Sequence, residues 1–306
     1  MINFFDKIYS SINDRNDFWT LLKFKSLLRF IIRLFCNMYF PIHFFISSRR
    51  YFLNKYSKDK PNKIIVSLTS FPLRINRLYL VVECLLRQNM LPDRILLWLS
   101  KEQFQNDGDL PKNLINLKKR GLEIYYVDGD IKSHKKYYYS IKYYPKSLII
   151  TVDDDIFYPS HFIKKLYLEH LKYPKAIICH RGKEIVQNAN KGYNDWPLLS
   201  MQKGPSRNIF FTSGGGTLFP PGSLHSDVLN KSSFMKYCKN ADDVWLNYMA
   251  LLCSTMIFKT SYCSNLLPVI SRNNKHLYTY NIHDNGNNSS IKNLEKIYNM
   301  KIAKEI

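Results

Sequence analysis

The sequence predicts an α/β fold with a mostly parallel, Rossmann-like sheet, helices on both faces of the sheet, and an N-terminal amphipathic helical segment. Three observations predict it: four apolar runs are uninterrupted, segments with helical spacing separate them, and acidic or hydroxyl residues follow them. Strands that are buried on both faces give such runs. The chain has 306 residues, of which 45% are hydrophobic, so it can bury a core of this kind.

The first 60 residues are predicted to form an amphipathic helix and a linker, ahead of a main domain that spans residues 61–306. Residues 18–40 are apolar except for a polar stripe at helical spacing, which consists of Lys23, Ser26, Arg29, Arg33 and Asn37. The longest run without Lys, Arg, Asp or Glu covers residues 34–48, which is shorter than the roughly 18 residues that a spanning helix needs. A helix lying on an anionic membrane surface is one interpretation, and a helix packed on the main domain is the other.

Cysteine usage and charge restrict the compartment and the partners. The six cysteines are scattered and form no CxxC pair, which is typical of a reducing compartment. We therefore expect a cytoplasmic protein that is peripheral on the inner face of the plasma membrane. The formal net charge of +21 favours an anionic partner, with a general bias of the surface toward Lys as the alternative. No DNA- or RNA-binding signature is present, so nucleic acid is not expected.

The predicted strands of the main domain are residues 63–69, 95–100, 122–128 and 147–152, and a helix is expected between each strand and the next. Thr69, Asp128 and the aspartates after residue 152 then fall at the carboxyl ends of strands. Because these ends meet at one edge of a parallel sheet, we expect the ligand site there.

Asp153, Asp154 and Asp155 follow the fourth predicted strand directly. Strand alternation predicts that Asp153 and Asp155 point to one side and Asp154 to the other. Two converging carboxylates repel each other unless a cation lies between them, and Mg²⁺ or Mn²⁺ prefers such ligands and completes its shell with a pyrophosphate. The pattern predicts a metal site at Asp153 and Asp155, with Asp154 among the donor-binding residues. A DxD that occurs in a loop by chance is the alternative.

Asp242 and Asp243 form a second acidic cluster, at the start of an amphipathic stretch. Acidic residues at a helix start also satisfy free N–H groups and the helix dipole, so plain capping is one interpretation. The catalytic interpretation makes one of them a general base, which removes a proton from an attacking hydroxyl.

Gly214, Gly215 and Gly216 lie between the two acidic clusters, in the sequence TSGGGTLFPPG. Successive glycines allow a ligand to approach the backbone closely, although a structural turn would look the same. The glycine spacing excludes a P-loop and a dinucleotide-binding fingerprint. Lys135 and Lys136 follow the third strand and are placed to meet phosphate at a helix start, with a solvated charged face as the alternative.

In this order, the motifs resemble those of GT-A glycosyltransferases, specifically a family-2-like group found in bacterial capsule and lipopolysaccharide gene clusters. They cover about residues 63–290 and consist of VSLTSFP, ILLWLS, HKKYYYSIKYYP, ITVDDDIFYP, CHRG, GGGTLFPPG and ADDVWLNYMA. The resemblance implies a GT-A fold in which Asp153 and Asp155 hold the metal and the donor diphosphate. It implies further that residues 214–216 shape the acceptor side and that Asp243 is the base, with Asp242 beside it.

The chain departs from this pattern at two places. Many relatives carry an aspartate after the second strand that binds the nucleobase or ribose, whereas this chain has Ser100. Asp128 or the loop from Thr69 to Arg74 is predicted to take that role. A late histidine often completes the metal shell in GT-A enzymes, and His283 is the candidate here.

Taken together, these features predict an inverting, metal-dependent glycosyltransferase. It would move a sugar from a nucleotide-sugar donor to a lipid-linked or surface polysaccharide acceptor at the cytoplasmic membrane surface. Inversion follows from a base at Asp243, because one direct displacement inverts the anomeric configuration. Two alternatives are a metal-dependent nucleotidyl- or phosphoryltransferase, which also uses paired carboxylates, and a non-enzymatic basic protein that binds membrane or nucleic acid.

Overall fold

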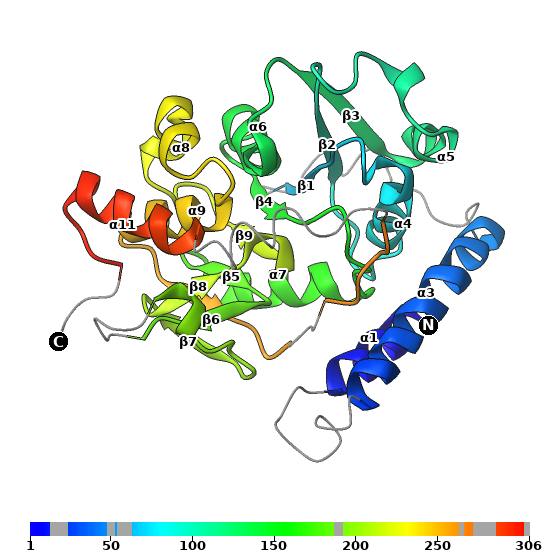
Figure 1. Ribbon diagram of the computed structural model, residues 1–306, viewed down its shortest axis with the longest axis horizontal. Coiled ribbons are helices and arrows are strands. Elements are labelled where there is room, and N and C mark those ends of the chain that lie inside the picture. The colour runs from blue at the N-terminus through cyan, green and yellow to red at the C-terminus, as the bar shows by residue number, and fades with distance from the viewer. Residues whose placement is uncertain are drawn as a thin grey trace.

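The computed structural model describes residues 1–12, 24–47, 53, 63–186, 192–262, 266–271 and 286–302 (Figure 1). Its main feature is a single eight-stranded sheet with helices on both sides. The strand order across this sheet is β3 (Leu122–Val127), β2 (Arg94–Ser100), β1 (Ile64–Thr69), β4 (Leu148–Thr151), β9 (Thr217–Phe219), β5 (Ile177–Cys179), β10 (Ile257–Lys259) and β7 (Lys203–Ser206). The predicted α/β fold is confirmed.

The sheet is parallel in its first half and mixed in its second half. Strands β3, β2, β1 and β4 run parallel, and β10 runs parallel to β5. Strand β9 is inserted antiparallel between β4 and β5, and β7 lies antiparallel at the edge. A separate two-stranded sheet pairs β6 (Gly182–Glu184) with β8 (Ile209–Phe211). Because Thr217 of β9 pairs with Thr151 of β4, the residues just before β9 lie at the carboxyl end of β4.

The four predicted strands are confirmed to within one residue at each end. The sheet lies between two hydrophobic cores, and alternate side chains of its strands enter one core or the other. In β1, Ile64, Val66 and Leu68 enter the first core and Ile65 enters the second. The first core is covered by α1 (Ile2–Ser11), α3 (Phe24–Ser47), α4 (Ile75–Leu86), α5 (Lys112–Ile115) and α7 (Phe162–Lys172). The second core is covered by α6 (Lys135–Tyr143), α8 (Lys231–Tyr237), α9 (Asp242–Leu252) and α11 (Gly286–Tyr298).

The N-terminal helices α1 and α3 lie side by side at one edge of the molecule (Figure 1). Helix α3 begins well before Leu34 and continues through Pro41, so the charge-free run of residues 34–48 underestimates its apolar length. By length and composition alone, α3 is the one helix in the described ranges that could cross a membrane. The predicted linker, residues 54–62, lies outside the described residues.

Asn37, a member of the predicted polar stripe of α3, is buried and only 6% exposed. Its side chain donates to the Pro268 carbonyl at 2.9 Å and accepts from the Ile270 N–H at 2.8 Å. A buried amide is tolerated because both of these bonds replace bonds to water. Asn37 therefore fixes α3 to the main domain, and the outward face of the helix is apolar.

Candidate active site

The three consecutive aspartates do not alternate as predicted, because β4 ends at Thr151 and Asp154 and Asp155 lie in a turn. Arg74 Nη1 lies 2.8 Å from Asp154 Oδ1 and 2.9 Å from Asp155 Oδ2. Ser70 Oγ donates to Asp154 Oδ2 at 2.5 Å. Asp154 and Asp155 therefore converge on Arg74, which comes from the loop after β1 that the sequence singled out.

Asp153 faces the glycine loop. Its carboxylate lies so close to the backbone of Gly214 that a Cβ there would come within 1.6 Å of Asp153 Oδ2. Tyr158 strengthens this contact, since its hydroxyl accepts from the Asp153 N–H at 2.8 Å and donates to the Gly214 carbonyl at 2.6 Å. Residues 153–155, here called the aspartate turn, and residues 214–216, here called the glycine loop, thus form one wall of a common site.

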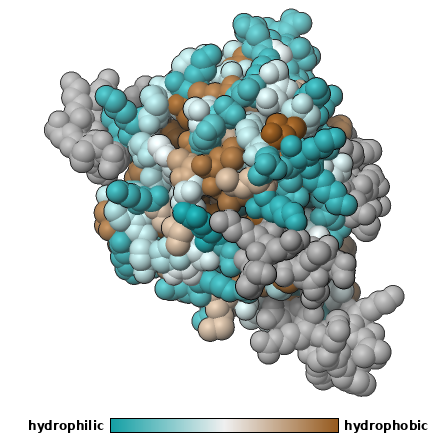
Figure 2. All heavy atoms as spheres, turned by 90° about the vertical axis from the view of Figure 1, so that its left-hand side faces the viewer, coloured by the Kyte–Doolittle hydropathy of each residue, from teal (hydrophilic) through white to brown (hydrophobic). Residues whose placement is uncertain are grey.

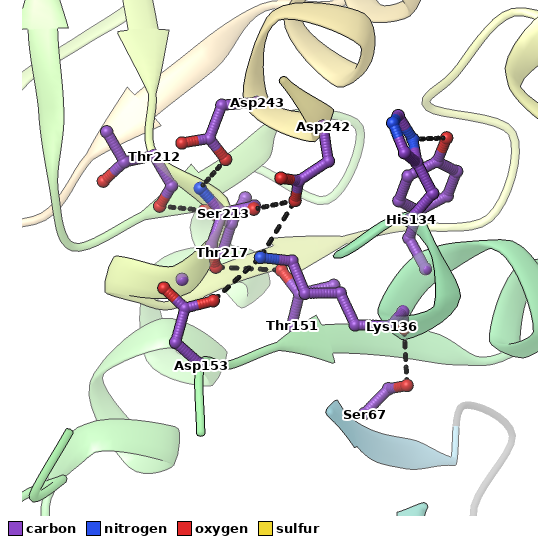
Figure 3. A network of polar contacts seen from close by, with 12 residues as sticks. Ser67, His134, Lys136, Thr151, Asp153, Thr212, Ser213, Thr217, Asp242 and Asp243 are labelled. Atoms are coloured by element: carbon purple, nitrogen blue, oxygen red, sulfur yellow. Dashed lines mark hydrogen bonds and ion pairs between the residues drawn. The ribbon is translucent and has the colours of Figure 1, made fainter. Parts of the chain in front are cut away.

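Lys136 joins this wall to the second acidic cluster (Figure 3). Its ammonium nitrogen lies 2.8 Å from Asp153 Oδ1 and 2.9 Å from Asp242 Oδ2, and its side chain is 4% exposed. Burial alone would lower the pKa of Lys136, but the surrounding carboxylates raise it well above its usual value. Lys136 is therefore a permanent buried cation between two motifs that lie far apart in the sequence.

Asp242 and Asp243 occupy the first turn of α9, and both are held by the residue before the three glycines. The Ser213 N–H donates to Asp243 Oδ1 at 2.8 Å, and Ser213 Oγ donates to Asp242 Oδ2 at 3.0 Å (Figure 3). The helix has no side-chain cap at Ala241, which precedes it. The acidic pair is thus bonded to the glycine loop and to Lys136, which goes beyond plain capping.

The two carboxylates of α9 differ in acidity. Burial would raise the pKa of Asp242, but Lys136 outweighs burial and lowers this pKa to about 2. Burial and the charge of Asp242 raise the pKa of Asp243 to about 6. Neighbouring carboxylates with such divergent pKa values are typical of sites that divide acid–base roles. Asp242 stays ionised, and Asp243 can exchange a proton near neutral pH.

The site carries an excess of negative charge that fits a divalent cation. Within the described ranges five carboxylates gather here, at positions 153–155, 242 and 243, and Arg74 and Lys136 are the cations bonded to them. Burial and the neighbouring carboxylates raise the pKa of Asp155 to about 7. In the described part of the chain, no group of three or more His, Cys, Asp or Glu side chains is arranged to coordinate a metal ion. Asp153 and Asp155 supply hard oxygens of the kind that Mg²⁺ and Mn²⁺ prefer, so they are the residues here that could bind a divalent cation.

The remaining predicted donor-binding residues are more dispersed. Lys135 is buried and bonded to Asp130, and Asp128 is exposed at the end of β3 and paired with Lys101 at 2.9 Å. Thr69 Oγ1 donates to the Trp98 carbonyl at 2.8 Å. Their roles toward a donor stay predictions. His283 lies outside the described residues.

Gly215 and Gly216 are packed too tightly to carry side chains. A Cβ at Gly215 would lie 2.7 Å from Arg181 Cβ, and one at Gly216 would lie 2.3 Å from the Phe162 ring. Gly216 also has a φ of +100°, a conformation that L side chains rarely adopt. Local packing thus accounts for two of the three glycines, while Gly214 faces the carboxylate of Asp153.

Sequence reasoning missed four residues that position this site: Ser70, Tyr158, Ser213 and Asn247. Asn247 lies one turn after Asp243 on α9 and donates to the Asp243 carbonyl at 2.8 Å and to the Phe211 carbonyl at 2.8 Å. Ser213 and Tyr158 lie inside the quoted sequences TSGGGTLFPPG and ITVDDDIFYP, so their neighbourhood was visible in the sequence. Their distant partners were not, because Ser213 bonds to residues 29 and 30 positions away and Tyr158 bonds to Gly214, which is 56 positions away.

No protein-family model matches this chain, and no curated protein matches its sequence. Solved structures are similar to it at low identity, with TM-scores below 0.5. One is a 4-diphosphocytidyl-2C-methyl-D-erythritol synthase from Anaerococcus prevotii, with 19% identity and a TM-score of 0.42 over 67% of this chain and 93% of that one. Another is a mannosyltransferase from Pyrobaculum calidifontis in complex with GDP-Man and Mn²⁺, with 11% identity and a TM-score of 0.43 over 82% and 70%.

A third is S. aureus TarS 1–349 in complex with UDP-GlcNAc, with 12% identity and a TM-score of 0.49 over 79% of this chain and 68% of that one. A second TarS structure is matched over 59% of its own length. At these identities and scores, the similarity assigns no function to this chain.

Proposed function

We propose that this protein is an inverting, divalent-cation-dependent glycosyltransferase that uses a nucleotide-sugar donor. The observation that carries the proposal is the bridge made by Lys136, which joins Asp153 of the aspartate turn to Asp242 of α9 beside the glycine loop. Three motifs that are separate in the sequence thereby form one acidic site at the carboxyl end of β4, where parallel sheets bind ligands.

On the donor side, Asp153 and Asp155 would hold Mn²⁺ or Mg²⁺ together with the diphosphate of the donor. A cation held there would supply Lewis acidity to neutralise charge on the leaving nucleoside diphosphate. Arg74 orients Asp155 and holds Asp154 through the same guanidinium nitrogen. Lys136 orients Asp153 and keeps positive charge close to the phosphates.

On the acceptor side, Asp243 is the group that accepts the proton of the attacking hydroxyl. Its pKa of about 6 leaves it ionised at neutral pH, yet basic enough to take a proton during attack. The Ser213 N–H fixes one carboxylate oxygen at 2.8 Å, which leaves the other oxygen for the acceptor. Direct attack assisted by this base inverts the configuration of the transferred sugar.

The proposal is tested by incubating the purified full chain with nucleoside-diphosphate sugars, with Mn²⁺ present and absent, and by measuring the released products. Slow hydrolysis in the presence of Mn²⁺ should release nucleoside diphosphate from one class of donor. Asp153→Asn should remove donor binding in calorimetry, whereas Asp243→Asn should keep binding and lose turnover. Release of pyrophosphate would assign a nucleotidyltransferase instead, and a chain that binds none of the donors would refute the proposal.

For the acceptor, we propose a lipid-linked glycan that is presented at the cytoplasmic membrane surface. Support comes from the apolar helix α3 and from the formal net charge of +21, which both favour an anionic interface. With a donor identified, extracted lipid-linked oligosaccharides should stimulate the release of nucleoside diphosphate and become labelled. Equal stimulation by free sugars would argue against a lipid-linked acceptor.

A further inference from the structure

The outward face of α3 is a continuous apolar surface. Its large hydrophobic side chains are between 44% and 83% exposed and follow helical spacing from one end of the helix to the other: Phe24, Leu27, Phe30, Ile31, Leu34, Phe35, Met38, Ile42, Phe45 and Ile46. A helix of this length extends for about 36 Å. Exposure of so many large apolar side chains along one helix is costly in water and marks an interaction surface.

The opposite face of α3 is fixed to the main domain along much of its length. Phe40 packs on Phe157 with ring centroids 4.9 Å apart, and Asn37 bonds to the backbone at residues 268 and 270. Near the end of the helix, Arg87 lies 4.4 Å from the Phe44 ring centroid and donates to Ser47 Oγ at 3.0 Å. A helix that crossed a bilayer would lose these contacts, so the structure favours a helix that lies flat.

The charge of α3 favours an anionic partner for its apolar face. Residues 24–47 contain Lys25, Arg29 and Arg33 and no Asp or Glu, within a chain whose formal net charge is +21. The one acidic residue of α1, Asp6, is buried and accepts from the Tyr262 hydroxyl at 2.7 Å. These basic residues continue, at helical spacing, the stripe that carries the buried Cys36 and Phe40, so they lie opposite the exposed apolar face. An apolar face opposite a basic face is the pattern of helices that bind at the surface of anionic lipid bilayers.

We propose that the outward face of α3 docks this protein onto an anionic lipid bilayer, with the helix axis parallel to the membrane plane. Helix α1 extends the surface, because Phe4 is 60% exposed and Phe5 of the same helix packs against Phe35 with ring centroids 5.3 Å apart. The docking surface lies at one edge of the molecule, away from the acidic site. It goes beyond the proposed catalytic function and does not depend on it.

The experiment is flotation of the purified full chain with phosphatidylcholine vesicles that contain or lack phosphatidylglycerol. The protein should float with the anionic vesicles and much less with the neutral ones. The triple variant Ile42→Ser/Phe45→Ser/Ile46→Ser removes the most exposed apolar groups near the end of α3, which are 63%, 83% and 77% exposed. It should lower vesicle binding by about ten-fold or more, because each apolar group that enters the interface adds to the affinity.

A matched control is Leu168→Ser/Leu171→Ser, which removes two exposed leucines of α7 that are 45% and 58% exposed. This variant should bind vesicles as the natural chain does. Both variants should keep the Tm of the natural chain, which separates loss of docking from loss of folding. In cells, alkaline carbonate should release the natural chain from membranes, as expected for a helix that does not cross them.

Three results would overturn the proposal. Equal flotation of the triple variant and the natural chain would show that α3 is not the docking surface. Retention after alkaline carbonate would assign a spanning helix. A natural chain that ignores vesicles and elutes as a dimer, which the triple variant converts to a monomer, would assign the surface to a second copy of this chain.

Discussion

At the scale of single residues, one buried lysine determines how two adjacent aspartates behave. Lys136 bonds to Asp242, whose pKa is lowered to about 2, while Asp243 has no ion pair in the described residues and its pKa is raised to about 6. The sequence shows only two neighbouring acids. The difference between them arises in three dimensions, from the position of one ammonium group.

The first prediction concerns Asp243→Asn, which should lower turnover by about 100-fold or more, because general bases contribute rate factors of this size. The amide can still accept from the Ser213 N–H, so donor binding should be unchanged in calorimetry. In the natural chain, turnover should fall as the pH falls through about 6, since protonated Asp243 cannot act as a base.

The same variant should be more stable than the natural chain at neutral pH. The pKa of Asp243 is raised from 3.8 to about 6, so folding disfavours its ionised form, and this cost is fully present above about pH 6. A neutral amide at this position does not carry the cost. The Tm of the variant should therefore be higher at pH 7 than that of the natural chain, and the difference should disappear near pH 4. A lower Tm at pH 7 would contradict the assigned pKa.

The second prediction concerns Lys136→Met, which leaves Asp153 and Asp242 without their shared cation. Loss of one partner from a buried ion pair costs about 3–5 kcal/mol, so urea denaturation should show a large decrease in the free energy of unfolding. The control is Lys132→Met, since Lys132 is exposed and pairs with Asp130, a contact worth about 1 kcal/mol or less. Equal effects in the two variants would show that Lys136 is not buried as described.

At the scale of elements, the insertion of β9 between β4 and β5 creates the site. The pairing of Thr217 with Thr151 places the glycine loop directly over the aspartate turn, and Thr151 Oγ1 donates to the Ser213 carbonyl at 3.0 Å. A three-residue strand holds this loop because both of its edges are paired.

The third prediction concerns Gly214→Ala, which should disturb the site more than the fold. The new Cβ would meet Asp153 Oδ2 at 1.6 Å, so Asp153 must move away from Lys136 or from the donor. Metal-dependent donor binding should fall by about ten-fold or more in calorimetry. Gly108→Ala is the control, because a Cβ there meets only the Asn106 side chain, at 2.9 Å, on the surface. Normal donor binding by Gly214→Ala would show that the glycine loop is not part of the donor site.

At the scale of the whole molecule, the sequence was sufficient to predict the strands in the first half of the sheet, but not those in the second half. Four long apolar runs predicted β1 to β4 closely, because buried parallel strands leave a continuous hydrophobic signal. Strands β5, β9 and β10 have only three residues each and depend on pairing with distant segments. No periodic pattern can develop over so short a length.

Contacts between distant segments also limited what the sequence could predict about the site and about α3. The acidic motifs were predicted because aspartates after a buried strand are unusual, but the convergence of Asp154 and Asp155 on Arg74 depends on a turn that the sequence does not specify. Asn37 was placed in a polar stripe, and helical spacing cannot tell a buried amide with distant backbone partners from an exposed one.

The fourth prediction follows from the shared core of the N-terminal helices and the main domain. Removal of residues 1–47 would expose Phe157 and other core residues that Phe40 and Phe44 cover. The truncated chain should have a lower Tm and a tendency to aggregate, in contrast to the triple α3 variant, which changes exposed residues only. A truncated chain with the Tm of the natural one would show that α3 is independent of the main domain.

The face of the molecule opposite α3 also carries apolar residues, gathered in an area that hydrophilic residues surround (Figure 2). Exposed hydrophobic groups are therefore not confined to one edge. For this reason the experiments on α3 need control substitutions of exposed leucines elsewhere.

The contacts of Lys136 determine how late in synthesis the acidic site can form. Its backbone carbonyl accepts from Ser67 of the first strand, and its ammonium group holds carboxylates at positions 153 and 242. During synthesis, the segment that contains Asp242 leaves the ribosome last of these. A nascent chain that has already assembled its first four strands thus still lacks the bridge between positions 153 and 242, which can form only after Asp242 has been made.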